Sequence, residues 1–239
     1  MNKYLKEYEW SNIGAMLRNN KVDPEECSDD FRGKLVVLSG ATSGIGYHTA
    51  RIFAEHGANL LLINRNEEKS RALCTEIAQE YGVSCEYRIA DYSRLSDVFA
   101  VGEELARSDY TIDVIIHNAG VYLTKLQFTD DGIEEVFQVN YLASFILNYL
   151  LMDKLRAQES CRILYVNSEG HRFAIAGLRL DDLDWRRKRY SGLRGYGSAK
   201  TAQLLSLIEF GKRFSGTGVT INAMHPGNVI TNMGENNGG

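Results

Sequence analysis

The stretch Gly40-Ala41-Thr42-Ser43-Gly44-Ile45-Gly46 decides the fold of this chain. An apolar run ends just before it at Ser39 and a segment with helical periodicity follows it, so the pattern predicts a strand, a tight turn and a helix in succession. The unpaired N–H groups and the positive dipole end of such a helix lie where a pyrophosphate can bind. We therefore predict a dinucleotide-binding turn, with an ordinary structural loop as the alternative.

The three glycines of this turn have different expected tasks. Gly40 permits the turn itself, Gly44 lets the backbone approach the ligand closely, and Gly46 lets the helix pack tightly on the strand. The residues expected to contact the dinucleotide are Gly40, Thr42, Ser43, Gly44, Ile45 and Gly46.

From Gly33 onward, short runs rich in leucine and β-branched residues alternate with longer helical segments. That alternation predicts an α/β fold with a doubly wound parallel sheet and helices on both faces. Because the runs are nearly all apolar, each strand is expected to be covered on both sides. The predicted strands are 34–39, 59–64, 84–90, 112–117, 162–167 and 219–224. The predicted helices are 45–56, 67–81, 94–107, 131–158 and 196–214.

Residues 33–239 are expected to form one domain, and residues 1–32 differ from it in composition. They are polar and charged, with one short amphipathic piece over 10–17, and we expect an extension packed on the domain. Partial disorder of this extension is the alternative reading.

Charge and cysteine usage exclude several classes of protein. A formal net charge of −4 offers no basic field for nucleic acid or an anionic membrane surface. The cysteines lack metal-ligand spacing, so they are expected to be reduced, partly buried thiols that hold no metal. No signal peptide and no uncharged run long enough to cross a bilayer occurs, so we expect a soluble cytoplasmic protein without a membrane anchor. The four cysteines are Cys27, Cys74, Cys85 and Cys161.

The end of the second predicted strand favours NADP(H) over NAD(H). An acidic residue there would bind the ribose hydroxyls of NAD and repel a 2′-phosphate. This chain has neutral Asn64 followed by Arg65, whose planar, permanently charged guanidinium suits a phosphate. The alternative is that Arg65 pairs on the surface with Glu67 or Glu68.

The segment Tyr196-Gly197-Ser198-Ala199-Lys200 places a phenol and an ammonium four residues apart, which makes them neighbours on one helix face. A phenol ionises near pKa ~10, too high for easy proton exchange at neutral pH, and a nearby cation favours the phenolate. We therefore predict that Lys200 lowers the pKa of Tyr196 and that Tyr196 acts as general acid and base. Both side chains are also expected to contact the cofactor.

The glycine spacing G-x-x-x-G-x-G resembles that of the short-chain dehydrogenase/reductase family. The segment His117-Asn118-Ala119-Gly120 matches that family's Asn-Asn-Ala-Gly, with His117 replacing the first Asn. The resemblance extends from Gly33 to about Thr231 and implies a Rossmann fold. Twenty-seven residues separate Ser168 from Tyr196, and this long insert is similar to the retinol-dehydrogenase-like and WW-domain-oxidoreductase-like branch.

The resemblance implies roles for further residues. Ser168 would polarise the substrate carbonyl or hold the developing alkoxide. Asn140 would hold a water that links Lys200 to solvent, giving a relay of Ser168, Tyr196, Lys200 and Asn140. Further cofactor contacts are implied for the segments after the third, fourth and sixth strands, namely Asp91, Tyr92, Asn118, Ala119, Gly120, Pro226, Gly227, Val229 and Thr231.

These features predict hydride transfer between NADP(H) and a carbonyl or alcohol substrate. One alternative is a cofactor-binding scaffold or redox sensor without strong catalysis, because the chain stops soon after residue 224, where the family continues to a seventh strand. We accordingly expect a truncated carboxyl terminus that lacks this strand. A second alternative is a sugar-nucleotide epimerase. Apolar residues around much of helices 131–158 and 196–214 favour a homodimer.

Overall fold

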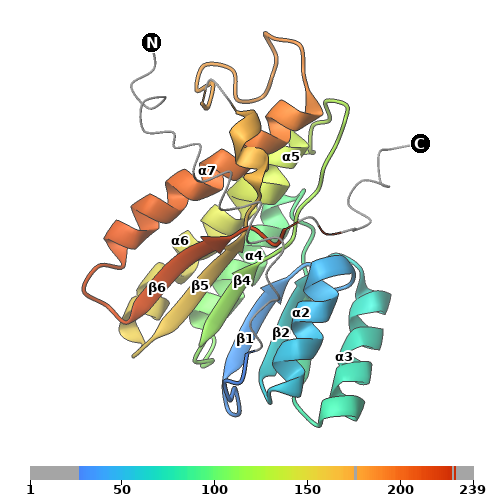
Figure 1. Cartoon of the computed structure of the whole chain (residues 1–239), viewed down its shortest axis with the longest axis vertical. Helices are drawn as coiled ribbons and strands as arrows, with labels where there is room; N and C mark the ends of the chain where they lie inside the picture. Colours follow the sequence, from blue (N-terminus) through green and yellow to red (C-terminus); the bar gives the residue numbers. More distant parts are fainter. Residues whose placement is uncertain (1–26, 175–176, 228, 230–239) are drawn as a thin grey trace.

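The computed structural model describes residues 27–174, 177–227 and 229. Its core is one parallel sheet of six strands in the order β3-β2-β1-β4-β5-β6 (Figure 1). The strands are β1 (Leu35–Ser39), β2 (Asn59–Asn64), β3 (Cys85–Ile89), β4 (Val114–His117), β5 (Cys161–Val166) and β6 (Val219–Met224). The predicted doubly wound Rossmann architecture is confirmed, and β6 is the last strand in the described part of the chain.

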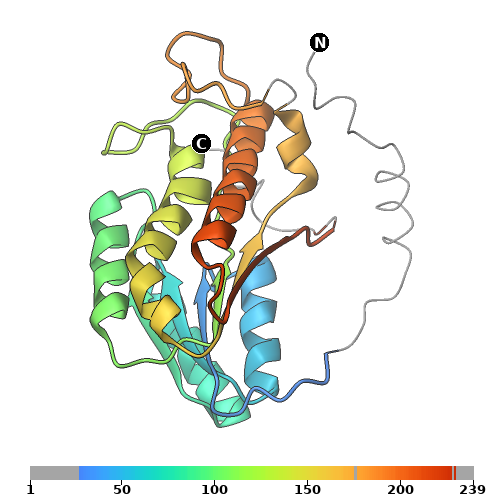
Figure 2. The same ribbon diagram turned by 90° about the vertical axis from the view of Figure 1, so that its left-hand side faces the viewer.

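Helices cover both faces of this sheet (Figures 1 and 2). On one side α2 (Gly44–Glu55) and α3 (Glu67–Tyr81) pack against alternate strand residues such as Val36 and Leu38. On the other side α4 (Leu95–Arg107), α6 (Ala143–Ala157) and α7 (Gly192–Arg213) pack against their neighbours such as Val37. The alternation arises because successive strand side chains point to opposite faces.

The strand order reverses between β1 and β4, the two central strands. In open α/β sheets a crevice forms at such a point, just beyond the carboxyl ends of the strands. The glycine turn follows β1, and Asn118 follows β4. The fold therefore places these two segments beside each other at the expected ligand-binding edge.

The two edge strands differ from the prediction that every strand is covered on both sides. Glu86 and Ile89 of β3 are exposed, and so are Thr220, Asn222 and Met224 of β6. An edge strand has only one neighbour and incomplete helix cover, so several of its side chains reach solvent. The expectation fails here because it treated a mostly apolar run as evidence of a central position.

The predicted single helix over 131–158 is broken in the structure. A short helix α5 (Glu135–Phe137) leads into a π-helical turn, η2 (Gln138–Leu142), before α6 begins. The start is fixed by Glu134, whose carboxylate accepts hydrogen bonds from the N–H groups of Val136 and Phe137. A cap of this kind satisfies donors that have no partner within the helix.

Two further differences concern the segments around the predicted reacting centre. A 3₁₀ turn, η3 (Glu169–Phe173), follows β5 directly, and α7 begins at Gly192, four residues before Tyr196. Tyr196 therefore lies in the second turn of α7.

No helix among the described residues is both long enough and apolar enough to span a bilayer. Most of the expected extension 1–32 and Thr231 lie outside the described residues.

Candidate active site

The backbone of the glycine turn strongly favours glycine at two positions. Gly40 has φ +70° and Gly44 has φ +56°, which L side chains rarely adopt. Gly46 is required for a different reason, since a Cβ there would lie 2.2 Å from the carbonyl oxygen of Gly40. The turn and α2 thus pack so closely that only hydrogen atoms fit between them, as predicted for Gly46.

Asn118 fastens this turn to the end of β4. Its Nδ2 donates to the carbonyl oxygens of Ser39 (3.1 Å) and Gly40 (2.9 Å). The Ser39 hydroxyl oxygen in turn accepts from the N–H groups of Asn118 and Ala119. Asn118 and Ala119 therefore hold the shape of the predicted cofactor turn, and a cofactor would contact a surface already set by these bonds.

The first turn of α2 is suited to an anion. Ser43 stands at the N-cap with an extended backbone, yet its side chain makes no capping hydrogen bond. The first turn also contains no acidic residue. The free N–H groups and the helix dipole therefore face outward without an internal partner, which is the arrangement a diphosphate requires.

Asn64 and Arg65 have different places at the end of β2. Asn64 is buried, and its Oδ1 accepts from the N–H of Ala41 at 2.8 Å, while its Nδ2 is a buried donor without a partner. Arg65 is exposed and forms no ion pair with any described residue. Glu67 pairs instead with Arg71, so the surface pairing considered for Arg65 with Glu67 is absent.

Asp91 and Tyr92, after β3, lie differently from each other. Asp91 is half-buried, and one carboxylate oxygen accepts from the N–H and the hydroxyl of Ser93. Tyr92 is 6% exposed and its ring packs in the core beside Val37 and Ile63. Any contact of Tyr92 with a cofactor would have to come from its backbone.

Ser168 and Tyr196 come together across Gly170. Ser168 ends the segment after β5, and its Oγ accepts from the N–H of Gly170 at 3.0 Å. A Cβ on Gly170 would lie 2.7 Å from the ring of Tyr196 and 3.2 Å from the Ser168 Oγ, so the absence of a side chain at this glycine lets the two groups approach each other. Gly197 allows the same close approach of α7, because a Cβ there would meet the Gly170 carbonyl oxygen at 2.8 Å.

The electrostatics of Tyr196 and Lys200 correct one prediction. Burial raises the pKa of Tyr196 above its usual value, and a hydrogen bond with Ser168 acts in the opposite direction. Burial also lowers the pKa of Lys200 to about 8. The Lys200 Nζ lies 5.6 Å from the Tyr196 ring centroid. The predicted lowering of the Tyr196 pKa by Lys200 is therefore wrong for the protein without a ligand, because burial disfavours the charged phenolate.

Two buried amides, missed by the sequence reasoning as site residues, hold Lys200 in place. The Lys200 Nζ donates to the carbonyl oxygen of Val166 (2.9 Å) and to Oε1 of Gln203 (3.3 Å). Asn167 donates to the same Gln203 Oε1 and to the Lys200 carbonyl oxygen, and accepts from the N–H of Ser168. A polar residue three positions after Lys200, on its buried face, was the available signal.

Asn140 lies in the π-helical turn, 1% exposed, with both ends of its amide occupied. Its Oδ1 accepts from the N–H of Val121 at 2.7 Å, and its Nδ2 donates to the Val121 carbonyl oxygen at 2.9 Å. The adjacent Tyr122 packs edge-on against Tyr196 at 5.8 Å. Asn140 thus fixes the loop behind Tyr196, and the implied water relay stays a prediction.

The segment after β6 approaches the same edge. The N–H of Asn167 donates to the carbonyl oxygen of Met224 at 2.8 Å, which joins the ends of β5 and β6. Pro226 and Gly227 follow directly and are half-buried, while Val229 is 49% exposed. The structure therefore gathers the glycine turn, Asn118, Ser168, Tyr196 and Lys200 along the carboxyl edge of the sheet.

Comparisons with known proteins agree with this geometry. A family model described as short chain dehydrogenase matches residues 34–179. Retinol dehydrogenase 13 from Homo sapiens is 36% identical over 208 residues, covering 86% of this chain and 62% of that protein. WW domain-containing oxidoreductase from Homo sapiens is 36% identical over 207 residues, covering 84% and 50% respectively. The chain therefore spans about half to three fifths of the length of these relatives.

A solved structure matches over much of the fold. A short-chain dehydrogenase from Sphingobium yanoikuyae in complex with NADPH superposes with a TM-score of 0.71 at 26% identity. The match covers 86% of this chain and 75% of that protein.

Proposed function

Because this chain belongs to the short-chain dehydrogenase family of oxidoreductases, we propose that it transfers a hydride between NADP(H) and a carbonyl or alcohol substrate. The observation that supports this most directly is the approach of Ser168 and Tyr196 across Gly170, beside the glycine turn. When bound, the nicotinamide cofactor supplies the hydride. The chain's own residues supply binding, orientation and proton transfer.

Tyr196 is proposed to exchange the proton at the substrate oxygen, with Ser168 hydrogen-bonded to the same oxygen. Burial keeps the Tyr196 phenol protonated by raising its pKa. The protein without ligand is therefore poised to donate a proton, which suits carbonyl reduction. Lys200, held by Val166 and Gln203, is proposed to carry the positive charge of the site and to contact the cofactor.

The glycine turn and the uncapped start of α2 fit a dinucleotide diphosphate. For the adenosine end we propose that Arg65 and Asn64 favour NADP(H), since Arg65 is exposed without an ion pair among the described residues and Asn64 offers an unpartnered donor. A related solved structure contains NADPH. Asp91, Gly120, Pro226, Gly227 and Val229 are proposed to complete the cofactor contacts.

The surroundings of Tyr196 favour an apolar substrate. Tyr122 packs against its ring, and Phe173 in η3 and Leu193 in the first turn of α7 are 47% and 49% exposed. Exposed apolar side chains on the elements that carry the reacting groups indicate a surface for apolar ligands. Relatives named retinol dehydrogenases are named for an alcohol of this character.

Replacing Tyr196 with Phe tests the proposal. Loss of the proton donor should lower kcat by about 10²–10⁴-fold for aldehyde or ketone reduction. The dissociation constant for NADPH, measured by fluorescence titration, should stay within a few-fold of the parent value. Tyr149→Phe is the matched control, because Tyr149 is 57% exposed on α6 and away from the site. Undiminished turnover in Tyr196→Phe would remove Tyr196 from the reaction, whereas NADPH binding without any turnover by the parent chain would favour the scaffold alternative.

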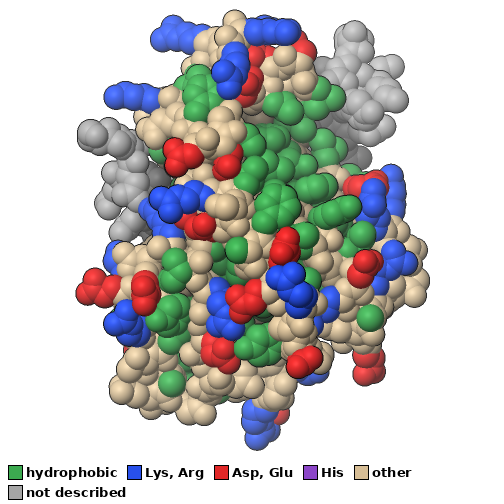
Figure 3. Space-filling view, turned by 180° about the vertical axis from the view of Figure 1, so that it is seen from behind, with side chains coloured by type: hydrophobic (Ala, Val, Ile, Leu, Met, Phe, Trp, Pro, Cys, Tyr) green, Lys and Arg blue, Asp and Glu red, His purple; other side chains and the backbone are tan. Residues whose placement is uncertain are grey.

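We also propose that the chain forms a homodimer through α6 and α7. Apolar side chains gather into one area in the upper part of the rear face of the molecule (Figure 3). On the outward sides of these helices Tyr149, Leu205 and Ile208 are each more than half exposed. An isologous pairing of two copies would bury this surface.

A further inference from the structure

A pair of thiols lies far from the proposed active site, between α3 and the edge strand β3. Cys85 is the first residue of β3, and Cys74 lies near the middle of α3. The Sγ atoms are 2.9 Å apart, with the Cys85 thiol donating to the Cys74 sulfur. A disulfide requires about 2.05 Å, so an approach of about 0.9 Å would join them.

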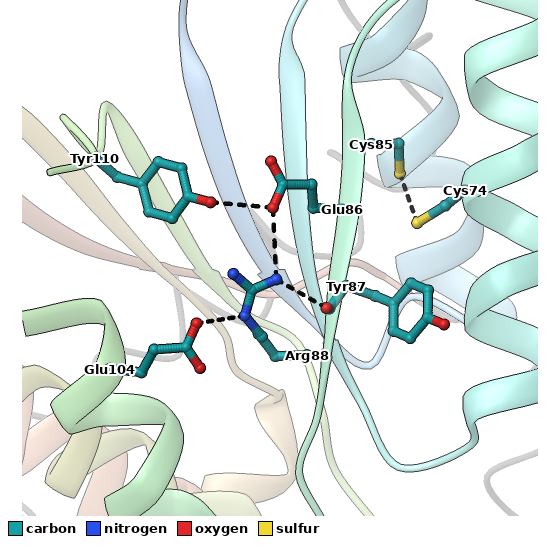
Figure 4. Close-up of polar contacts among 7 residues, drawn as sticks. All are labelled: Cys74, Cys85, Glu86, Tyr87, Arg88, Glu104 and Tyr110. Atoms are coloured by element: carbon teal, nitrogen blue, oxygen red, sulfur yellow. Dashed lines mark hydrogen bonds and ion pairs between the residues drawn. The ribbon is translucent and has the colours of Figure 1, made fainter. Parts of the chain in front are cut away.

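The backbone of β3 directs the Cys85 thiol toward Cys74 on α3 (Figure 4). Alternate residues of β3 point to opposite faces, so Cys85 faces α3, whereas Glu86 and Arg88 face the other side of the sheet. There Arg88 pairs with Glu104 of α4, and Glu86 accepts from the Tyr110 hydroxyl. These contacts anchor the strand and hold Cys85 in its orientation.

The surroundings leave the pair free to react with each other. Cys74 is 7% exposed and packs with Leu73 and Ile77 in the core beneath α2 and α3. Cys85 is half-buried at the open edge of the sheet, and because its sulfur touches that of Cys74, a small oxidant that enters there reaches both sulfurs. Among the described residues no cluster of three or more metal-ligating side chains occurs, so the pair lacks the further ligands that a metal ion needs.

We propose that Cys74 and Cys85 form an oxidation site at which hydrogen peroxide closes an intrachain disulfide. The Cys74 sulfur attacks one peroxide oxygen, the O–O bond breaks, and the departing oxygen takes the thiol proton and leaves as water. The Cys85 sulfur then attacks the resulting sulfenic sulfur, and its proton leaves with the sulfenic oxygen as a second water. Two thiols are oxidised to one disulfide, and one peroxide is reduced to two waters.

The hydrogen bond between the two thiols indicates which sulfur reacts first, and burial explains why Cys161 does not react. The hydrogen bond from Cys85 lowers the pKa of Cys74, and acceptance of that bond makes Cys74 the nucleophile. Cys161, the other buried cysteine, has its pKa raised to about 12 by burial and stays unreactive. Cys27 is exposed but has no thiol partner among the described residues.

The disulfide would join the outer helix α3 to the edge strand β3, at the end of that strand opposite to the ligand-binding edge. Because the cross-link restricts the unfolded chain, the midpoint of thermal unfolding should rise on the order of 5–10 °C. The oxidation site formed by Cys74 and Cys85 does not depend on the proposed hydride transfer. The test of this site is therefore valid whether or not the chain has dehydrogenase activity.

The test treats the full chain with a small excess of hydrogen peroxide, blocks free thiols, and digests it after glutamate without a reductant. The fragments 69–76 and 81–86 each contain one of the two cysteines, and they should be recovered as one linked species, two hydrogen atoms lighter than their sum. A reductant should separate them and reverse the rise in the unfolding midpoint.

Variants make the result specific. Cys74→Ala and Cys85→Ala should each abolish both the linked species and the peroxide-induced rise, while Cys161→Ala should retain both. Circular dichroism of the untreated variants establishes that they fold. The proposal is overturned if both thiols are recovered blocked after peroxide treatment, or if folded Cys74→Ala shows the same peroxide-induced rise as the parent chain.

Discussion

The shape of the glycine turn requires that residue 46 carry no side chain larger than the hydrogen atom of Gly46. A Cβ at this position would lie 2.2 Å from the Gly40 carbonyl oxygen and 2.5 Å from the Asn118 Nδ2. The nearest atom belongs to the backbone and cannot rotate away, and the Asn118 amide is held by its own hydrogen bonds. An added methyl group would therefore move the turn away from α2 and disturb the N–H groups that face the ligand.

We expect Gly46→Ala to lower the free energy of unfolding by about 1–3 kcal/mol and to weaken NADPH binding. Urea unfolding and fluorescence titration measure the two effects. Gly211→Ala is the matched control, because its Cβ would meet only Ile221 at 3.8 Å and alanine favours a helix. The control should be neutral or stabilising by about 0.5–1 kcal/mol. Equal behaviour of the two variants would contradict the packing argument.

Arg65 allows the cofactor preference to be measured at one residue. Its exposed guanidinium has no ion pair in the described part of the chain, so its removal breaks no salt bridge there and weakens only a longer-range attraction to Glu135. A hydrogen bond to a charged group contributes about 1.5–3 kcal/mol, which corresponds to about 10–100-fold in affinity. Arg65→Ala should raise the dissociation constant of NADPH by this factor and leave that of NADH nearly unchanged. Equal effects on both cofactors would count against a 2′-phosphate contact.

Lys200 makes stability depend on pH in the protein without ligand. Burial lowers its pKa from 10.5 to about 8 in the folded chain. Between these values the unfolded chain still holds the proton that the folded chain has released, so the free energy of unfolding rises with pH. The contribution across this interval is about 3 kcal/mol. Below pH 8 the cost of burying the charge is present in full.

Lys200→Met removes this titration while keeping a side chain of similar length. The stability of the variant relative to the parent should therefore fall by about 3 kcal/mol between pH 8 and pH 10.5. Urea unfolding at several pH values measures it, and other titrating groups cancel in the difference. Parallel curves for the two proteins would show that Lys200 does not titrate in this range.

At the scale of residues, the sequence predicts which residues lie at the proposed site better than it predicts their pKa shifts. The spacing of Tyr196 and Lys200 places both at the proposed site, and Gly40 and Gly46 are favoured for the reasons expected, whereas the expected approach of Gly44 to a ligand stays a prediction. The direction of the Tyr196 pKa shift could not be predicted, because it depends on burial, which is set by Tyr122 and Gly170 from distant parts of the chain. Gln203 was missed although its place three positions after Lys200 offered a signal.

At the scale of elements, the long segment between η3 and α7 is fastened to the start of α5 by a hydrogen bond from the half-buried Tyr190 to a buried acid. The Tyr190 hydroxyl donates to the Glu134 carboxylate at 3.0 Å, and Glu134 is 1% exposed. The same carboxylate caps α5 through the N–H groups of Val136 and Phe137. One buried acid thus positions both the helix start and the segment that leads into Tyr196.

Tyr190→Phe should lower the free energy of unfolding by about 1.5–3 kcal/mol, because the buried carboxylate loses one of its donors. Burial already raises the pKa of Glu134, and the Tyr190 hydroxyl acts against that rise. Removal of the hydroxyl therefore raises the pKa further, so the loss of stability should grow as pH increases through the carboxyl range. Urea unfolding at pH 5 and pH 8 measures this change. Tyr149→Phe, at an exposed position, should show neither effect.

Periodicity predicted the positions of the helices and strands well, but it did not predict the interruption of the helix over 131–158. The apolar pattern over 131–158 continues through the π-helical turn, so periodicity alone gave no reason to divide the helix. The division coincides with Asn140, which binds both backbone groups of Val121. A π-helical turn of this kind often accompanies a functional site. Such breaks depend on contacts with loops that lie elsewhere in the sequence.

At the scale of the whole molecule, the strand order places all of the proposed chemistry at one edge of the sheet and leaves an apolar helical surface elsewhere. Leu142, Phe145, Tyr149 and Met152 recur every three or four residues along the outward side of η2 and α6, and each is at least partly exposed. On α7, Leu205 and Ile208 are 53% and 55% exposed. Contiguous apolar surface of this extent is unfavourable in water, which argues for cover by a second copy.

A charge placed in this surface should therefore separate the subunits. Tyr149→Glu and Ile208→Glu would each introduce two carboxylates into an isologous interface, one from each copy, at a desolvation cost that the pairing cannot offset. Light scattering after size exclusion should give the dimer mass for the parent chain and the monomer mass for both variants, with unchanged circular dichroism. Ile52→Glu is the matched control, because Ile52 is 52% exposed on α2, outside this surface, and the variant should remain dimeric. A parent chain that is monomeric at micromolar concentration would contradict the proposed dimer, and a variant that stays dimeric would place the interface on another face.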